Sequence, residues 1–455
     1  MTPELLGRAF AEAPNPELAR IAVSRVGERA VARDLLARPE ITSAAARLLG
    51  FSTAASDFFS ANPEELESLA DLRPRSANDF LAEGRHDVGH LGPPAGLRRF
   101  RRRAAYRIAA RDLFGAPVDE VMAELTWIGE ACLRIALEHI EGAAALAIIG
   151  MGKLGGRELN YASDVDVLFV HDGASMSQEA GSRAGARLMV LLSEATADGV
   201  AVRVDADLRP EGRAGPVSRS FESMREYYEK HAATWERQAL VKARPVAGDT
   251  RLGEAFVAAV VPFIYPAVLP ASAIEDVRTS KVRIEELVRA RGKESVELKR
   301  GYGGIRDVEF AVQLLQLVHG RRYDRLREPS TLAALEALAD EGFVSHEDAN
   351  TLAGSYRFLR RLEHRLQMVR DTQTHELPAD PTALGPLARS LGLRSADELL
   401  TQFRTHTETV RGLHERLFYR PLLEAFADPS PPPGADRLAT EELLAGLGFA
   451  DPPAA

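Results

Sequence analysis

Apolar residues recur at helical spacing over most of this 455-residue chain. Before about residue 95, short periodic segments are separated by prolines, which predicts a set of short helices. The same spacing returns after Phe221, and it predicts long helices at 273–290, 305–319, 330–341 and 346–368. Most of the chain is therefore expected to be helical, and its second half is expected to form a helical bundle.

The periodicity changes in the middle of the chain. Residues 143–149 form a continuous apolar run that ends at Gly150, as expected for a buried strand. Further strands are predicted at 164–170 and 200–205, with a helix at 182–197 between them. This alternation predicts a mixed α/β core inside a mostly helical protein, so the expected fold class is α+β.

These patterns divide the chain into four parts. Residues 1–96 form an N-terminal helical region that ends near a Gly-Pro-Pro turn. Residues 97–275 hold the α/β core and are expected to be the catalytic domain, and 276–427 form the helical bundle. Residues 428–455 contain three consecutive prolines and then a segment that stops in mid-pattern. We expect a linker there, and the chain to be a fragment of a longer protein.

Two predicted helices carry many charges. The helix at 97–113 contains seven arginines, and we expect a solvated basic face with Phe100, Ile108 and Leu113 packed inward. A surface that contacts anions is the alternative. For the charged segment from Arg357 to Arg365 we likewise expect a solvated or salt-bridged face.

Composition narrows the class of protein. Hydrophobic residues make up 45% and charged residues 27%, which is ordinary for a globular protein, and the net charge of −9 argues against a general nucleic-acid binder. The single cysteine, Cys132, allows no intramolecular disulfide and is expected to be a packed thiol. No apolar stretch is long enough for a membrane span, so a cytoplasmic protein without membrane partners is expected.

Carboxylates on the predicted strands indicate metal chemistry. Asp164 and Asp166 are two residues apart on one strand and should point to the same side. Two carboxylates so close repel each other and stay ionised together mainly when a cation lies between them. Asp205 ends the next strand and can reach the same point. Oxygen ligands of this kind select Mg²⁺ or Mn²⁺, so a site for one or two such ions in phosphoryl chemistry is predicted.

A glycine turn before the first aspartate supplies a place for phosphate. The backbone N–H groups of Gly155 and Gly156 are expected to approach phosphate oxygens, with Lys153 neutralising charge and the Ser163 hydroxyl donating a hydrogen bond. A glycine turn followed by Asp-x-Asp on a strand and a third strand-borne carboxylate is typical of the nucleotidyltransferase superfamily. The dinucleotide-binding fingerprint is the rival interpretation, but 156–163 is too short for the helix that this fold requires next.

Four further basic residues are candidates for contacts to the nucleotide or to phosphate. Arg209 follows the third strand, and Lys242 lies on a segment that we expect to be helical. Lys299 and Arg306 flank a second glycine turn, 301–304, that opens a helix and would suit an anion. An ordinary helix start is the alternative interpretation of that turn.

The longest motifs resemble the glutamine synthetase adenylyltransferase family. The resemblance rests on the run from Gly150 to Asn160 followed by Ser-Asp-Val-Asp at 163–166, and on Val-Asp-Ala-Asp-Leu-Arg-Pro at 204–210. It continues in Trp-Glu-Arg-Gln-Ala-Leu-Val-Lys-Ala-Arg at 235–244 and in Gly-Gly-Ile-Arg-Asp-Val-Glu-Phe at 303–310. It covers about residues 97–425. Asp205, rather than Asp207, matches the position of the family's third carboxylate.

Full-length members of that family have two related halves, one that removes AMP from a tyrosine of glutamine synthetase by phosphorolysis and one that attaches AMP from ATP. The motif at 303–310, followed by 316–321, resembles the N-terminal, adenylyl-removing half. The resemblance therefore implies glutamine synthetase as protein substrate, ATP or ADP and phosphate as ligands, Mg²⁺ or Mn²⁺ as cofactor, and a PII-type signal protein as a partner. Adenylyl transfer from ATP and a non-catalytic regulatory role remain the alternatives.

Overall fold

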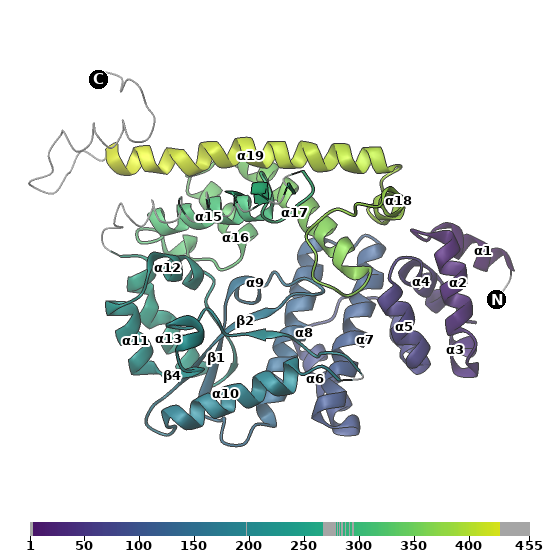
Figure 1. Cartoon of the computed structure of the whole chain (residues 1–455), viewed down its shortest axis with the longest axis horizontal. Helices are drawn as coiled ribbons and strands as arrows, with labels where there is room; N and C mark the ends of the chain where they lie inside the picture. Colours follow the sequence, from purple (N-terminus) through teal and green to yellow (C-terminus); the bar gives the residue numbers. More distant parts are fainter. Residues whose placement is uncertain are drawn as a thin grey trace, which may run out of the picture.

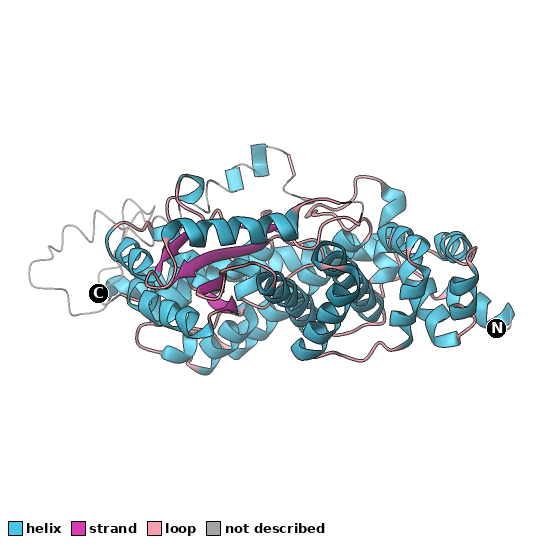
Figure 2. Ribbon diagram, turned by 90° about the horizontal axis from the view of Figure 1, so that it is seen from below, coloured by secondary structure: helices cyan, strands magenta, loops and turns pink. Residues whose placement is uncertain are grey.

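The computed structural model describes residues 3–196, 198–266, 279, 281, 283, 285–286, 288–290, 292–293 and 295–427. It confirms a mostly helical α+β fold with one small mixed sheet (Figures 1 and 2). The predicted segment at 428–455 lies outside the described residues, as does most of the helix predicted at 273–290. Within the described part of the chain, no helix is both long and apolar enough to cross a membrane.

Short helices make up one end of the molecule (Figure 1). They are α1 (Pro3–Ala11), α2 (Pro16–Val26), α3 (Ala30–Leu35), α4 (Pro39–Leu49), α5 (Thr53–Ala61) and the 3₁₀ helix η1 (Pro63–Ala70). Prolines open α2 and α4, because the first helical position needs no backbone N–H. Asn15 and Ser52 accept hydrogen bonds from the first turns of α2 and α5.

Three longer helices, α6 (Ala77–Leu91), α7 (Pro93–Leu113) and α8 (Val118–Glu138), connect this end to the sheet. Gly92, at φ +78°, turns the chain between α6 and α7, and Pro93 is the first residue of α7. The Gly-Pro-Pro segment is thus a tight corner between packed helices, and the predicted division after residue 96 falls inside α7. Cys132 is buried in α8, and burial raises the pKa of its thiol to about 12, as expected for a packed cysteine.

The sheet has β1 (Leu146–Gly150) at its centre, antiparallel to β2 (Val165–His171) and β5 (Arg244–Gly248). Two short strands, β3 (Val204–Asp205) and β4 (Ser218–Ser220), pair in parallel with β2. The prediction of a strand at 200–205 was too long by four residues. Sequence analysis missed β4 and β5, because neither has an apolar alternation long enough to reveal it.

Helices cover both faces of the sheet. Ile148, Val167 and Phe169 pack into the core shared with α7, α8 and α10 (Gln178–Ser193). Ile149, Leu168 and other side chains of the opposite face pack against α11 (Phe221–Lys230), α12 (Thr234–Leu240) and α13 (Thr250–Ile264). Because both faces are buried, β1 and β2 are almost continuously apolar, and this explains why they were recognisable in the sequence.

The second half of the chain forms a layer of helices that lies above the sheet in the view of Figure 1. Its helices are α15 (Ile305–His319), α16 (Thr331–Asp340), α17 (His346–Met368), α18 (Pro381–Ser390) and α19 (Ala396–Ala427). Two single-turn 3₁₀ helices, η2 (Gly212–Ala214) and η3 (Asp324–Leu326), lie in loops, and the four-residue helix α9 (Gly152–Gly155) follows β1. The bounds of α15 and α17 are those predicted from the apolar periodicity.

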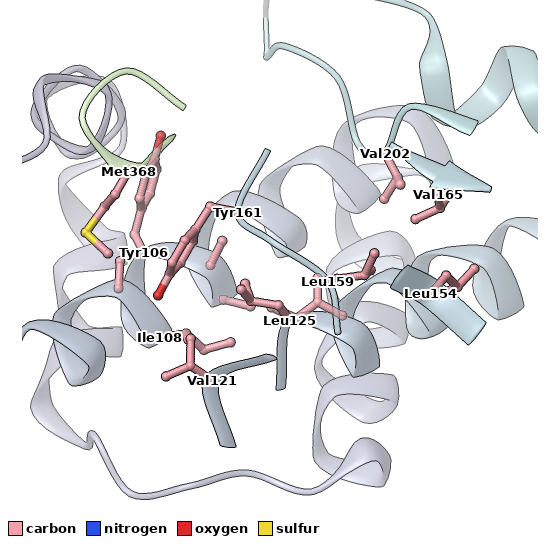
Figure 3. Close-up of a cluster of buried hydrophobic side chains, with 14 of the residues drawn as sticks. Tyr106, Ile108, Val121, Leu125, Leu154, Leu159, Tyr161, Val165, Val202 and Met368 are labelled. Carbon is pink, nitrogen blue, oxygen red and sulfur yellow. The ribbon is translucent and has the colours of Figure 1, made fainter. Parts of the chain in front are cut away.

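One apolar core runs from the helices α7 and α8 to the strands (Figure 3). Side chains from the helices, such as Ile108 and Leu125, are continuous with Leu159 and with Val165 of β2 (Figure 3). The segment that carries the predicted catalytic residues is therefore attached directly to the helical scaffold.

The expectation of a solvated basic face on the first arginine-rich helix is wrong. Arg98 and Arg107 of α7 are fully buried. Arg98 donates to the carbonyl oxygens of Pro94 and Gly199 at 2.7 and 2.9 Å, and Arg107 donates to that of Asp71 at 2.8 Å. These arginines satisfy carbonyl groups of neighbouring segments, which a helical pattern in the sequence cannot reveal.

The charged segment of α17 is buried as well, so the expected solvated face is again wrong, although ion pairs do form. Arg360, Glu363, His364 and Arg365 are each at most 1% exposed. Arg360 pairs with Glu363 at 3.1 Å, and Glu363 also meets the His375 ring at 2.8 Å. Burial opposes ionisation of Glu363, but the His375 ring and the charges of Lys153 and Arg360 hold its pKa below the usual range.

A buried ion pair joins the sheet to the layer of helices above it. The Glu158 carboxylate accepts from the Lys242 ammonium at 2.6 Å, and both side chains are almost fully buried. It also accepts from the backbone N–H and the hydroxyl of Thr331, the first residue of α16. Arg360 of α17 donates to the Glu158 carbonyl oxygen at 2.6 Å. Glu158 therefore caps α16 from a distant part of the chain and neutralises a buried lysine.

We expect Glu158→Ala to destabilise the protein by about 3–5 kcal/mol, because Lys242 would remain buried without a counter-charge. Arg357→Gln is the matched control. It removes an ion pair with Asp119 in which both side chains are more than 40% exposed, and it should cost less than about 1 kcal/mol. Urea unfolding of both variants tests this prediction, and equal midpoints would contradict it.

Candidate active site

Asp166 and Asp205 lie side by side in the parallel pairing of β2 with β3. Burial is the main reason that the pKa of the Asp166 carboxyl rises to about 6. The nearby carboxylates of Asp205 and Asp164 contribute to this rise, and the charges of Lys153 and Lys299 oppose it. Two carboxylates held this close in a partly buried site provide the oxygen donors that a divalent cation prefers. By donor chemistry, this pair fits Mg²⁺ or Mn²⁺.

Asp164 is directed to a different partner. It forms an ion pair with Arg203, which lies two residues before Asp205 on the neighbouring segment and also donates to the Ala162 carbonyl oxygen at 2.6 Å. Among the described residues, no three acidic, histidine or cysteine side chains gather closely enough to hold a metal ion. The structure thus brings two of the predicted carboxylates together and places the third against an arginine.

Sequence analysis missed Arg203. Strand alternation gives the signal that could have found it, because residues 203 and 205 must face the same side, as must residues 164 and 166. The cross-strand neighbours on that side are then one ion pair, Arg203 with Asp164, and one pair of like charges, Asp205 with Asp166.

Lys153 and Lys299 come together beside this carboxylate pair, although they are far apart in the sequence. The Lys153 ammonium and burial lower the pKa of Lys299 well below its usual range. The carboxylates of Glu363 and Glu309 oppose this lowering, although neither lysine forms an ion pair with a carboxylate among the described residues. Two close ammonium groups next to Asp166 would suit a phosphate group.

Gly155 and Gly156 fill a different role from the one expected. Their N–H groups donate to the carbonyl oxygens of Met151 and Gly152 at 2.9 and 3.0 Å, so the predicted hydrogen bonds to phosphate are already taken. A Cβ on Gly155 would come within 1.8 Å of the Lys242 carbonyl oxygen. Glycine is required here for close packing of α9 against the segment before β5.

Ser163 and Arg209 are also placed away from the carboxylate pair. Ser163 lines a separate cavity together with Val165, whose side chain points to the other side of β2 from Asp166. Arg209 donates to the carbonyl oxygens of Gly215 and Ala206 at 3.1 and 2.9 Å and holds the loop after β3 in place.

Lys242 does not lie on a helix, contrary to expectation. It follows α12 in a turn, and the strand β5 begins two residues later. Its ammonium binds Glu158 and Thr331, so the structure gives it the role of a buried link rather than an open contact to a nucleotide.

Arg306 lies at a cavity of about 450 Å³ above the second glycine turn. Lys299 and Arg300 line the same cavity, as do His375 and Glu376. The Arg306 guanidinium lies 5.6 Å over the Phe310 ring and has no hydrogen bond to the described residues. Burial lowers its pKa. Lys299 therefore lies next to both Asp166 and this cavity, which Lys293 and Glu297 also line.

Comparison with known protein families gives two matches. Residues 50–259 match the glutamate-ammonia ligase adenylyltransferase family, and residues 278–418 match the GlnD PII-uridylyltransferase family. The first match covers the carboxylate pair and Lys153, and the second covers Lys299 and Arg306.

Curated relatives carry the name bifunctional glutamine synthetase adenylyltransferase/adenylyl-removing enzyme. The chain is 42% identical to the one from Streptomyces avermitilis, over 99% of this chain and 47% of that protein. It is 44% identical to the one from Streptomyces coelicolor, over 90% of this chain and 43% of that protein. For the relative from Mycobacterium avium, the identity is 39% over 98% of this chain and 48% of that protein. The chain thus spans about half the length of these relatives.

Gly152 provides a test of the Asp166 position. At φ +50°, its missing Cβ would lie 2.5 Å from Asp166 Oδ2, so Gly152→Ala must displace that carboxylate. We expect Mn²⁺ affinity to fall about tenfold or more. Gly142→Ala is the control, because Gly142 also has a positive φ of +75° but open space around its missing Cβ. Calorimetric titration of both variants with Mn²⁺ measures the affinity. An unchanged Mn²⁺ affinity in Gly152→Ala would contradict the role of Asp166 as a metal ligand.

The raised pKa of Asp166 predicts a pH-dependent gain in stability for Asp166→Asn. Its carboxyl titrates at about 6 in the folded chain instead of 3.8, so its ionised form weakens folding above about pH 6. At pH 7.5 without metal, the variant should be more stable by up to about 3 kcal/mol, and near pH 4 this gain should vanish. Urea unfolding of the wild type and the variant between about pH 4 and pH 7.5 tests this prediction. A stability gain that is absent, or that does not change with pH, would contradict it.

Proposed function

Because residues 50–259 belong to the glutamate-ammonia ligase adenylyltransferase family, we propose that this chain removes AMP from adenylylated glutamine synthetase. In the proposed reaction, an oxygen of inorganic phosphate attacks the AMP phosphorus, the bond to the tyrosyl oxygen breaks, and ADP is released. The observation that supports this proposal is that Lys153 and Lys299 both lie next to Asp166 while Lys299 also lines the Arg306 cavity.

Asp166 and Asp205 would hold Mg²⁺ or Mn²⁺, with Asp164 as a third ligand once it leaves Arg203. The bound cation would neutralise charge on the transferred phosphoryl group. Lys153 would contact the same group from the side of α9. These residues carry out positioning and charge neutralisation, which supply most of the catalysis in phosphoryl transfer.

Phosphorolysis needs a second anion next to the AMP phosphate, and the Arg306 cavity supports this direction. Lys299 lines that cavity and also acts on Asp166 through its charge. We place the attacking phosphate there, held by Arg306 and Lys299 through charge-assisted hydrogen bonds. Adenylyl transfer from ATP is the second candidate, because the same cavity would accept the leaving pyrophosphate. Incubation with unmodified glutamine synthetase and labelled ATP distinguishes the two directions.

The match of residues 278–418 to a PII-uridylyltransferase family supports a PII-type signal protein as a partner of the helical layer. We further propose a cytoplasmic location, where the single buried cysteine would stay reduced.

Phosphate dependence tests the proposed direction. Adenylylated glutamine synthetase and phosphate should give ADP with the wild-type chain, and exclusive release of AMP would refute phosphorolysis. Arg306→Ala should raise the required phosphate concentration about tenfold to a hundredfold, because one charge-assisted contact is lost. Arg225→Ala, which removes a solvent-exposed arginine of α11, should leave this requirement unchanged. Equal phosphate dependence in the two variants would remove Arg306 from the site.

A further inference from the structure

A second cavity lies beside the starts of β2 and β3, where Ser163, Val165 and Arg203 line it. Its volume is about 380 Å³, within the range of pockets that bind small molecules. Apolar side chains shown in Figure 3, among them Leu125, Leu159 and Val202, line part of it. None of the roles proposed above uses this cavity.

Basic side chains outnumber acidic ones around the cavity. Four arginines line it, namely Arg101, Arg102, Arg203 and Arg370, against one carboxylate, Asp371. Arg101 and Asp371 neutralise each other in an ion pair of 2.6 Å. Arg102 stacks on the Phe58 ring at 4.9 Å and has no carboxylate partner among the described residues. The excess of positive charge, together with the hydroxyl group of Ser163, makes the cavity suitable for an anion.

Arg203 belongs to both this cavity and the active site. It lines the cavity, and its guanidinium also holds Asp164 in an ion pair. An anion in the cavity would compete with Asp164 for that guanidinium. A cation that binds Asp164 and an anion that binds Arg203 would each break this ion pair. Binding of either ligand should therefore strengthen binding of the other.

We propose that this arginine-lined cavity binds a small anion that bears phosphate or carboxylate groups, and that the bound anion releases Asp164 from Arg203 to complete the metal site. In the structure described above, Arg203 keeps one of the three predicted ligands away from the other two. The anion would thus act as an activator whose site is separate from the Arg306 cavity. The second half of this proposal rests on the proposed metal site, whereas the first half does not.

Anion binding is measured first, without metal, in the Arg306→Gln variant so that the other basic cavity is weakened. Calorimetric titration with sulfate and with succinate separates the phosphate-like from the carboxylate source. Arg102→Gln and Arg370→Gln should each weaken binding of the preferred anion about tenfold, whereas Arg213→Gln, at an arginine 87% exposed outside the cavity, should not. Absence of binding by both anions, or equal binding in all three variants, would overturn the proposal.

Coupling to the metal site is measured by Mn²⁺ titration, which needs no turnover. Arg203→Gln should tighten Mn²⁺ binding about fivefold or more, and Arg225→Gln, at the exposed arginine of α11, should leave it unchanged. The preferred anion should tighten Mn²⁺ binding in the wild type but have no effect in Arg203→Gln. Unchanged Mn²⁺ affinity in Arg203→Gln, or no effect of the anion on the wild type, would overturn the coupling. If AMP removal failed while the anion and Mn²⁺ titrations gave the expected results, only the proposed function would be contradicted.

Discussion

The buried ion pair between Glu158 and Lys242 is the contact on which the arrangement of the site depends. It joins the connection between β1 and β2, the chain entering β5 and the first turn of α16. Two buried charges are costly to separate, so this contact has essentially one geometry. This geometry matters for the candidate site, because the helical layer carries Lys299 and Arg306 while the sheet carries Asp166 and Asp205. Their proximity follows from a fixed position of the layer on the sheet.

The site itself contains two unresolved electrostatic conflicts next to each other. Asp166 and Asp205 repel, and this repulsion adds to the effect of burial on the pKa of Asp166. Lys153 and Lys299 repel in turn, which lowers the pKa of Lys299. A cation would relieve the first conflict. The carboxylates of Glu363 and Glu309 offset part of the second, and an anionic phosphate would offset more of it. Groups held against their mutual repulsion by a rigid scaffold are typical of functional sites, because the ligands supply the missing charge.

Sequence analysis predicted the parts of the fold that have a strong periodicity and the carboxylates that lie on apolar strands. The bounds of α15 and α17, and the strands β1 and β2, agree with those predictions. It failed where long-range contacts decide a side chain's role. Lys242 and Arg209 were expected at phosphate, but one is bound by Glu158 and the other by backbone carbonyl groups. Spacing along the chain gives the type of residue and its side of a strand, and it contains no information on such distant partners.

The central claim is that the carboxylate pair and the Arg306 cavity form a single site, with metal and phosphate bound next to each other. The longitudinal relaxation of ³¹P in inorganic phosphate, measured with Mn²⁺ bound to the protein, tests this claim most directly. The structure predicts strong paramagnetic enhancement that requires Asp166 for the metal and Arg306 for the phosphate, and that disappears in either variant. Relaxation of bound phosphate that is unaffected by bound Mn²⁺ would show two separate sites and contradict the claim.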